Sequence, residues 1–164
     1  MQPIDNIQWI HINKIKANNY NPNHVLQQEM QLIKTSILKN GWLHPIIINN
    51  DNTIIDGYHR ATLLKTDKEL QQLTQSQIPC ITLNLTEVEQ KLLTIRINRA
   101  KGTQTAYKMH EVIKELYNQG ITIKQLSKEI GATTEEIQLL IHDNIFQKEQ
   151  ITDETLYNQA WTPK

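Results

Sequence analysis

The stretch IIINNDNTIIDGYHRA, residues 46–61, restricts the fold of this chain more than any other. Two apolar runs are separated by a polar turn at Asp51-Asn52, which is the pattern of a β-hairpin. The second run ends in an acid and a glycine, and a helical pattern starts at or just after Gly57. The sequence therefore predicts a strand that enters a helix through a glycine.

This junction carries residues suited to binding an anion. Free N–H groups and the dipole at the start of a helix attract phosphate, and Gly57 allows a close approach or a positive φ. Arg60 offers a planar set of donors, and His59 can donate to the same oxygens or shuttle a proton. Asp56 repels phosphate unless a metal lies between them or it acts as a base. The alternative is an Asp cap followed by a solvated His-Arg pair.

The rest of the first hundred residues alternates between strand and helix patterns. Further strands are predicted over 7–15 and 78–85, and helices over 26–41, 58–73 and 86–102. Thr86 and Glu89 have the spacing of a capping box. Strand and helix patterns thus alternate through residues 1–104, which we expect to form one domain.

Residues 105–145 keep a helical period throughout. Helices are predicted over 106–120, 122–131 and 133–143, with Gly120 and Gly131 as stops. The last two have helix-turn-helix spacing, so a small helical domain is expected. Residues 146–164 are expected to form a polar tail, and Trp161 within it suggests that the tail docks on some surface.

Composition narrows the class of protein. With 164 residues, 38% hydrophobic, the chain can bury a core. The net charge is zero, which argues against a uniformly basic nucleic-acid binder, although residues 1–103 hold 11 Lys+Arg against 8 Asp+Glu and residues 104–164 hold 6 against 9. The single cysteine, Cys80, is expected to be a buried apolar residue. No signal or membrane-length segment is found, so we expect a cytoplasmic protein without a membrane partner.

Four stretches resemble one known family. DGYHRA resembles the phosphate-binding motif of the ParB/sulfiredoxin superfamily, and NNYNPN, SILKNGWLHPIIIN and RINRAKGT resemble other segments of ParB N-terminal domains. They occur in the family's order over residues 7–104, and RINRAKGT is most similar to short phage-borne and IbrB-like relatives. The resemblance implies an α+β domain with a nucleotide groove, followed by a helix-turn-helix.

The resemblance also implies a set of site residues and ligands. ParB proteins bind and hydrolyse CTP with magnesium, and some superfamily members are free-serine kinases that use ADP or ATP. The expected cofactors are therefore ATP or CTP with magnesium, and a homodimer is an expected assembly. Asp56 and His59 are the candidate catalytic residues, and Asp56 is the candidate magnesium ligand. The candidate nucleotide contacts are Asn21, Asn23, Gly57, His59, Arg60, Asn98, Arg99, Lys101 and Thr103.

The sequence departs from each branch of the superfamily. Sulfiredoxins carry a nucleophilic cysteine where this chain has Tyr58, which argues against sulfinic-acid repair. ParB proteins have Gly-Glu-Arg-Arg at the motif and an acid before the Arg that Arg99 matches, and residues 95–98 contain no acid. The serine kinases read Asp-Gly-His-His-Arg, one residue away from this motif, but the Glu of their first loop has no counterpart in residues 21–24.

The helical part is the candidate DNA-binding region. The resemblance places residues near Thr133 on a recognition helix, and Lys124, Lys128, Thr133 and Thr134 are the candidate contacts. Glu135 and Glu136 would oppose phosphates. A helical scaffold or a protein-interaction surface is the alternative.

Three functions remain open at this stage. The first is binding of a nucleoside triphosphate, with hydrolysis or transfer of its terminal phosphate. The second is a DNA-binding partition or transcription co-regulator of phage or mobile-element type, with nucleotide as a switch. The third is a ParB-like nuclease, for which the sequence offers no cluster of acidic ligands.

Overall fold

The computed structural model describes residues 2–20, 27–101 and 106–142. The chain divides into two compact units, Met1–Thr105 and Ala106–Lys164, which are described separately. Among the described residues, no helix is long and apolar enough to cross a membrane.

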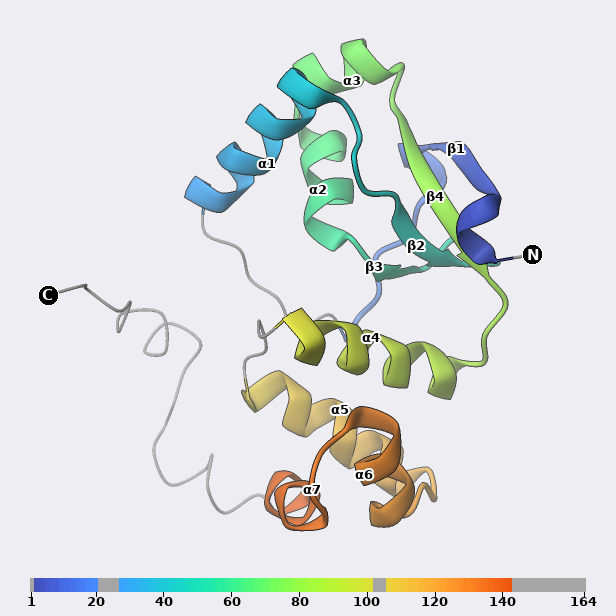
Figure 1. Ribbon diagram of the computed structural model, residues 1–164, viewed down its shortest axis with the longest axis vertical. Helices are drawn as coiled ribbons and strands as arrows, with labels where there is room; N and C mark the ends of the chain where they lie inside the picture. The colour runs from blue at the N-terminus through green and yellow to red at the C-terminus, as the bar shows by residue number, and fades with distance from the viewer. Residues whose placement is uncertain (1, 21–26, 102–105, 143–164) are drawn as a thin grey trace, which may run out of the picture. The chain divides into compact units, whose positions relative to one another are not determined.

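The N-terminal unit is built on one four-stranded sheet in the order β1-β4-β2-β3 (Figure 1). Its strands are β1 (Ile7–His11), β2 (Ile46–Asn49), β3 (Ile54–Asp56) and β4 (Gln77–Leu83). β2 and β3 form the predicted antiparallel hairpin, whereas β2 runs parallel to β4 and β1 runs antiparallel to it. The mixed α+β class is confirmed.

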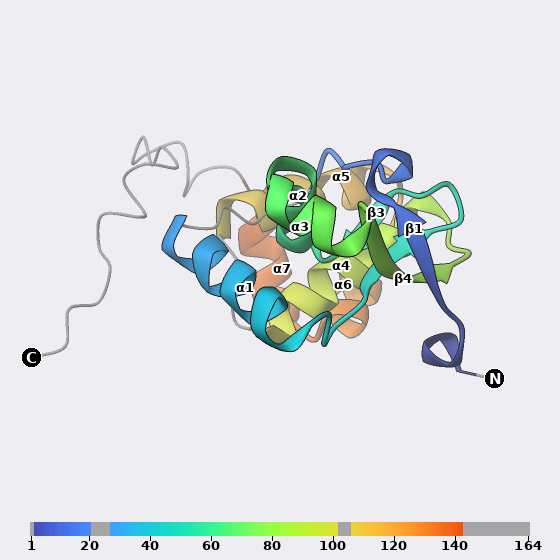
Figure 2. The ribbon, with the colours of Figure 1, turned by 90° about the horizontal axis from the view of Figure 1, so that it is seen from above.

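Helices cover both faces of this sheet (Figures 1 and 2). They are α1 (Gln27–Asn40), α2 (Tyr58–Thr66), α3 (Lys68–Thr74) and α4 (Glu87–Lys101), with short 3₁₀ helices at Pro3–Asp5 and Ile12–Lys14. α1, α2 and α3 lie on one side, and α4 lies against β3 on the other. Thr86 and Glu89 form the predicted capping box of α4.

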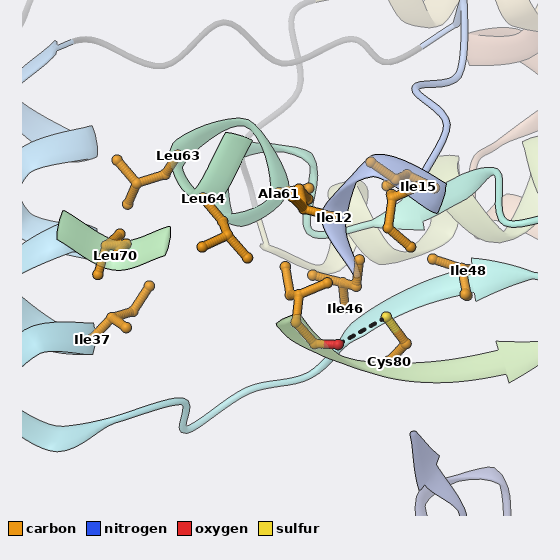
Figure 3. Packing of buried hydrophobic residues seen from close by; sticks show 12 residues of the cluster. Ile12, Ile15, Ile37, Ile46, Ile48, Ala61, Leu63, Leu64, Leu70 and Cys80 are labelled. Atoms are coloured by element: carbon orange, nitrogen blue, oxygen red, sulfur yellow. Dashed lines mark hydrogen bonds between the residues drawn. The ribbon is translucent and has the colours of Figure 1, made fainter. Parts of the chain in front are cut away.

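The main core lies between the sheet and α1–α3. Figure 3 shows Ile37, Leu64 and Leu70 from these helices together with Ile46 and Cys80 from the central strands. Cys80 is fully buried, as expected from the sequence, and its thiol donates to the Ile78 carbonyl at 3.3 Å. Burial raises the pKa of the Cys80 thiol to about 12.

Two predicted elements are shorter than expected. The helix predicted over 58–73 is broken at Asp67, whose carboxylate accepts from the Leu70 N–H at 3.0 Å and starts α3. A local Asp cap competes with helix continuation, and periodicity does not reveal that competition. The first strand ends at His11 instead of residue 15, because a 3₁₀ turn buries Ile12 and Ile15 in the core.

The C-terminal unit contains the three predicted helices. They are α5 (Ala106–Asn118), α6 (Ile123–Ile130) and α7 (Thr134–Ile141), and α7 contacts both α5 and α6. Gly131, with φ of 68°, ends α6, and three residues separate α6 from α7. The predicted tail, 146–164 with Trp161, lies outside the described residues.

Candidate functional site

Gly57 allows β3 to turn directly into α2. Its φ is 95°, and a Cβ at this position would lie 2.5 Å from Ile46 Cγ2. A residue with a side chain would therefore meet both backbone strain and a steric clash. As the N-cap of α2, Gly57 supplies no side-chain hydrogen bond to the helix. Helix geometry leaves the first amides of α2 without intrahelical acceptors, so this end of α2 favours an anion.

The carboxylate of Asp56 forms ion pairs with two basic side chains beside the start of α2. Arg60 Nη2 lies 3.3 Å from Asp56 Oδ2, and Lys101 Nζ lies 2.7 Å from Asp56 Oδ1. The side chains of Asp56 and Arg60 are 16% and 19% exposed, whereas that of Lys101 is 48% exposed. The half-exposed Lys101 is thus the member of the group most accessible to a ligand.

Arg60 already makes several contacts within the protein, in addition to any that it would make to a phosphate. Its Nη1 donates to the carbonyls of His44 at 2.6 Å and Pro45 at 2.9 Å. Burial lowers the pKa of the guanidinium and the charge of Asp56 opposes that shift, but an arginine still remains protonated. Arg60 therefore joins the segment before β2 to α2, and part of its donor set is already in use.

The end of α4 brings the second group of predicted residues to the same place. Thr94 Oγ1 donates to the Ile55 carbonyl at 3.1 Å, which fastens α4 to β3 one residue before Asp56. Asn98 is buried, Arg99 is half-buried and Lys101 is exposed. The site therefore combines the start of α2 with the basic last turn of α4.

A neighbouring polar group was missed from the sequence. Asn18 Nδ2 donates to the Ile54 carbonyl at 2.7 Å, and Lys91, fully covered, lies 5.6 Å from the centre of the Tyr20 ring. Within the described part of the chain, Asn18 Oδ1 and the Tyr20 hydroxyl are buried without a partner in hydrogen-bonding geometry. Burial raises the pKa of Tyr20, and the nearby Thr94 and Lys91 side chains oppose that rise.

A sequence signal for this group exists. Lys91, Thr94 and Asn98 recur at helical spacing among apolar residues of α4, so one polar stripe faces the interior. Lys91 pairs with Glu87 at 2.6 Å and Thr94 donates to the Ile55 carbonyl, so the unsatisfied polar atoms of this group are those of Asn18 and Tyr20.

The other predicted residues fall into three groups. His59 lies in the first turn of α2, with its ring edge-to-face against Tyr58. Lys124 and Lys128 are exposed on α6, and Thr133 caps α7 by accepting from the Glu136 N–H. Thr134 lies in the first turn of α7 beside Glu135. Asn21, Asn23 and Thr103 lie outside the described residues.

The described residues do not fit a magnesium ion held by the protein itself. No group of three or more His, Cys, Asp or Glu side chains gathers anywhere in the described ranges. Asp56 is the carboxylate at this site, and both of its oxygens are ion-paired. A two-metal nuclease centre would need a cluster of acidic ligands, which the described residues do not provide.

The geometry first defines a class: an α+β unit in which Asp56, Arg60 and Lys101 form a charged cluster where β3 turns into α2. A family model described as the ParB N-terminal domain matches residues 2–98. The chain therefore belongs to the ParB N-terminal domain family, and the predicted superfamily is confirmed.

Curated relatives agree with this assignment. YbdM of Escherichia coli (strain K12) is 30% identical over 167 residues, which span 99% of this chain and 79% of YbdM. A probable chromosome-partitioning protein ParB of Rickettsia bellii (strain RML369-C) is 30% identical over 145 residues, 87% of this chain. The chain spans only 48% of that ParB protein, about half its length.

Solved structures share the fold. The chromosome-partitioning protein ParB of Caulobacter crescentus, complexed to the centromeric parS site, matches with a TM-score of 0.54 and 14% identity over 93% of this chain and 76% of that chain. The pNOB8-like ParB N-domain matches with a TM-score of 0.55 and 11% identity, over 93% and 67% of the two chains. At these identities the likeness establishes the fold alone.

Proposed function

We propose that the N-terminal unit is a nucleotide-binding domain that takes a nucleoside triphosphate, CTP or ATP, in the cytoplasm. The single observation that carries this proposal is the Lys101–Asp56 contact, which brings the basic end of α4 to the start of α2. Membership of the ParB N-terminal domain family supports the same reading.

The phosphates would replace an internal charge partner. A triphosphate at the start of α2 meets the N-terminal end of that helix and competes with Asp56 for Lys101. Lys101 is half-exposed and can turn from the carboxylate to a phosphate, while Arg60 stays in place through the His44 and Pro45 carbonyls. Gly57 contributes through the turn, because its positive φ and its contact with Ile46 place the start of α2 directly after β3.

Hydrolysis or transfer of the terminal phosphate is the finer part of the proposal. Asp56 and His59 are its candidate groups, with Asp56 as general base and His59 as donor to the phosphate. Asp56 must first lose a cation partner, because an ion-paired carboxylate is a weak base. Asp56 would lose one of its two partners when Lys101 turns from the carboxylate to the phosphate.

Thermal unfolding with ATP, ADP, CTP and GTP, each with and without magnesium, tests the proposal. A ligand that binds only the folded protein raises the melting temperature by mass action. Lys101→Ala should lower the affinity by about tenfold or more, since a charge-assisted contact is lost. Lys65→Ala, an exposed lysine in the last turn of the same α2, is the matched control and should bind normally.

Two outcomes contradict the proposal. One is the absence of any shift with all four nucleotides. The other is an equal loss of affinity in Lys101→Ala and Lys65→Ala, which would indicate general attraction to positive charge. ATP-selective binding would be followed by assays with free serine, and CTP-selective binding by assays for a ParB-type switch.

Duplex DNA binding is a second candidate, favoured by the relatives named as chromosome-partitioning proteins and by the α6–α7 pair. Lys124, Lys128, Thr133 and Thr134 are its candidate contacts, and the acidic first turn of α7 opposes it. Binding to duplex DNA over a salt series tests this candidate. Failure to bind at low salt would exclude it, because phosphate contacts are strongest there.

A further inference from the structure

β1 is one of the two edge strands of the sheet in the N-terminal unit, and β3 is the other. β1 pairs with β4 on one side, and among the described residues no strand pairs with its other side (Figures 1 and 2). An edge strand presents a row of N–H and C=O groups that can pair with another strand.

The outward-facing backbone groups of β1 belong to Ile7, Trp9 and His11. The Ile12 N–H donates to the Ser76 carbonyl at 2.8 Å, and bonded pairs alternate along an antiparallel ladder. Gln8 and Ile10 therefore bond toward β4, and the odd-numbered residues face outward.

The position of a proline agrees with this alternation. Trp9 lies opposite Pro79, which has no N–H to donate. A bonded pair at that position would lack one of its two hydrogen bonds, so Trp9 belongs to the non-bonded set of the β1–β4 ladder.

The same residues expose apolar side chains. Ile10 packs into the core, so Ile7 and Trp9 point to the opposite face, where they are 43% and 53% exposed. Ile4, in the preceding 3₁₀ turn, is also 53% exposed. β1 contains no lysine, acid or proline, which are the residues that commonly protect an edge strand from pairing.

We propose that a second copy of this chain pairs with β1, antiparallel and centred on Trp9. In this register Ile7 lies opposite the partner's His11. The His11 carbonyl starts the 3₁₀ turn at Ile12–Lys14, so the remaining outward groups of each strand form about four hydrogen bonds. The two tryptophans meet across the two-fold axis, as an isologous interface requires.

Charge favours a second copy in this orientation. The exposed Asp5 precedes β1 and the exposed Lys14 follows it. Antiparallel pairing brings Asp5 of one copy toward the partner's Lys14, whereas parallel pairing would place like charges together. The strand itself contains no lysine, arginine, aspartate or glutamate that its own copy would repel.

Sedimentation velocity of the full chain at rising concentration tests the association. The wild-type protein should dimerise, and Trp9→Glu should weaken the dimer by at least about tenfold, because it places two carboxylates across the axis. Leu32→Glu, at an exposed leucine on α1, is the matched control and should dimerise normally. A monomeric wild-type protein, or a Trp9→Glu dimer of wild-type affinity, overturns the proposal.

A cross-linking pair tests the register even where Trp9→Glu fails to fold. Trp9→Cys should form a disulfide-linked dimer on mild oxidation, since position 9 faces itself across the axis. Gln8→Cys faces the partner's Ile10 and should not cross-link, and the buried Cys80 should stay unreacted in both variants. Equal cross-linking of the two variants, or none in Trp9→Cys, overturns the proposal.

Discussion

Lys101 Nζ lies 2.7 Å from Asp56 Oδ1, although 45 residues separate the two positions in the sequence. The contact exists because Thr94 binds the Ile55 carbonyl and holds α4 against β3. Asp56 thus neutralises part of the positive charge that a phosphate would use. The carboxylate and a phosphate compete for the same lysine.

Asp56→Asn should bind triphosphate more tightly than the wild-type protein. Removing one negative charge beside the ligand is expected to raise the affinity by on the order of tenfold at low salt. Isothermal titration with the nucleotide that raises the melting temperature measures this change. If Asp56→Asn instead binds the nucleotide more weakly than the wild-type protein, and only when magnesium is present, Asp56 is a metal ligand.

Arg60→Ala should destabilise the N-terminal unit. The substitution removes two hydrogen bonds to the His44 and Pro45 carbonyls and leaves Asp56 with one cation, which together cost roughly 2–4 kcal/mol. Chemical denaturation measures this loss. Arg96→Ala, at an exposed position on α4, should cost less than about 1 kcal/mol. Equal stability of the two variants would show that Arg60 is not a structural tie.

Gly57→Ala should cost more stability than Gly41→Ala. Both glycines have positive φ, 95° and 74°, so both substitutions carry backbone strain of about 1–2 kcal/mol. A Cβ at Gly57 also meets Ile46, whereas a Cβ at Gly41 meets nothing within 4 Å. The difference between the two unfolding free energies measures the steric clash. A difference near zero would mean that β2 moves aside freely.

Stability should fall at alkaline pH through Cys80. The thiol has a pKa of about 12 in the folded protein against 9.0 for an exposed cysteine, so the unfolded state loses its proton first. Below pH 9.0 the contribution of the Cys80 thiol to the free energy of unfolding does not change with pH. Above pH 9.0 the free energy of unfolding falls by at most about 1.4 kcal/mol per pH unit. Cys80→Ala should show a shallower decline over this range. Identical slopes would contradict a buried, protonated thiol.

The sequence by itself determined the local elements and the family. Hydrophobic periodicity and glycine positions predicted the β2–β3 hairpin, the start of α2 at Gly57 and the capping box of α4, because each depends on residues close together in the chain. The ordered motifs predicted the α+β class, which the fold confirms. The break between α2 and α3 at Asp67 was not predicted, because an Asp cap and a continued helix are both compatible with the same few residues.

Only the tertiary structure decided which charges meet. The sequence showed Asp56 and Arg60 in one motif and Lys101 in another, and the packing of α4 on β3 joined all three into one group. It also committed Arg60 to the His44 and Pro45 carbonyls and buried Lys91 beside Tyr20. No local pattern encodes these contacts, since each depends on a pairing between distant segments. The position of β1 at an edge of the sheet also comes from the tertiary structure. Strand order depends on the pairing of distant segments, here β1 with β4, which the sequence of either strand does not specify.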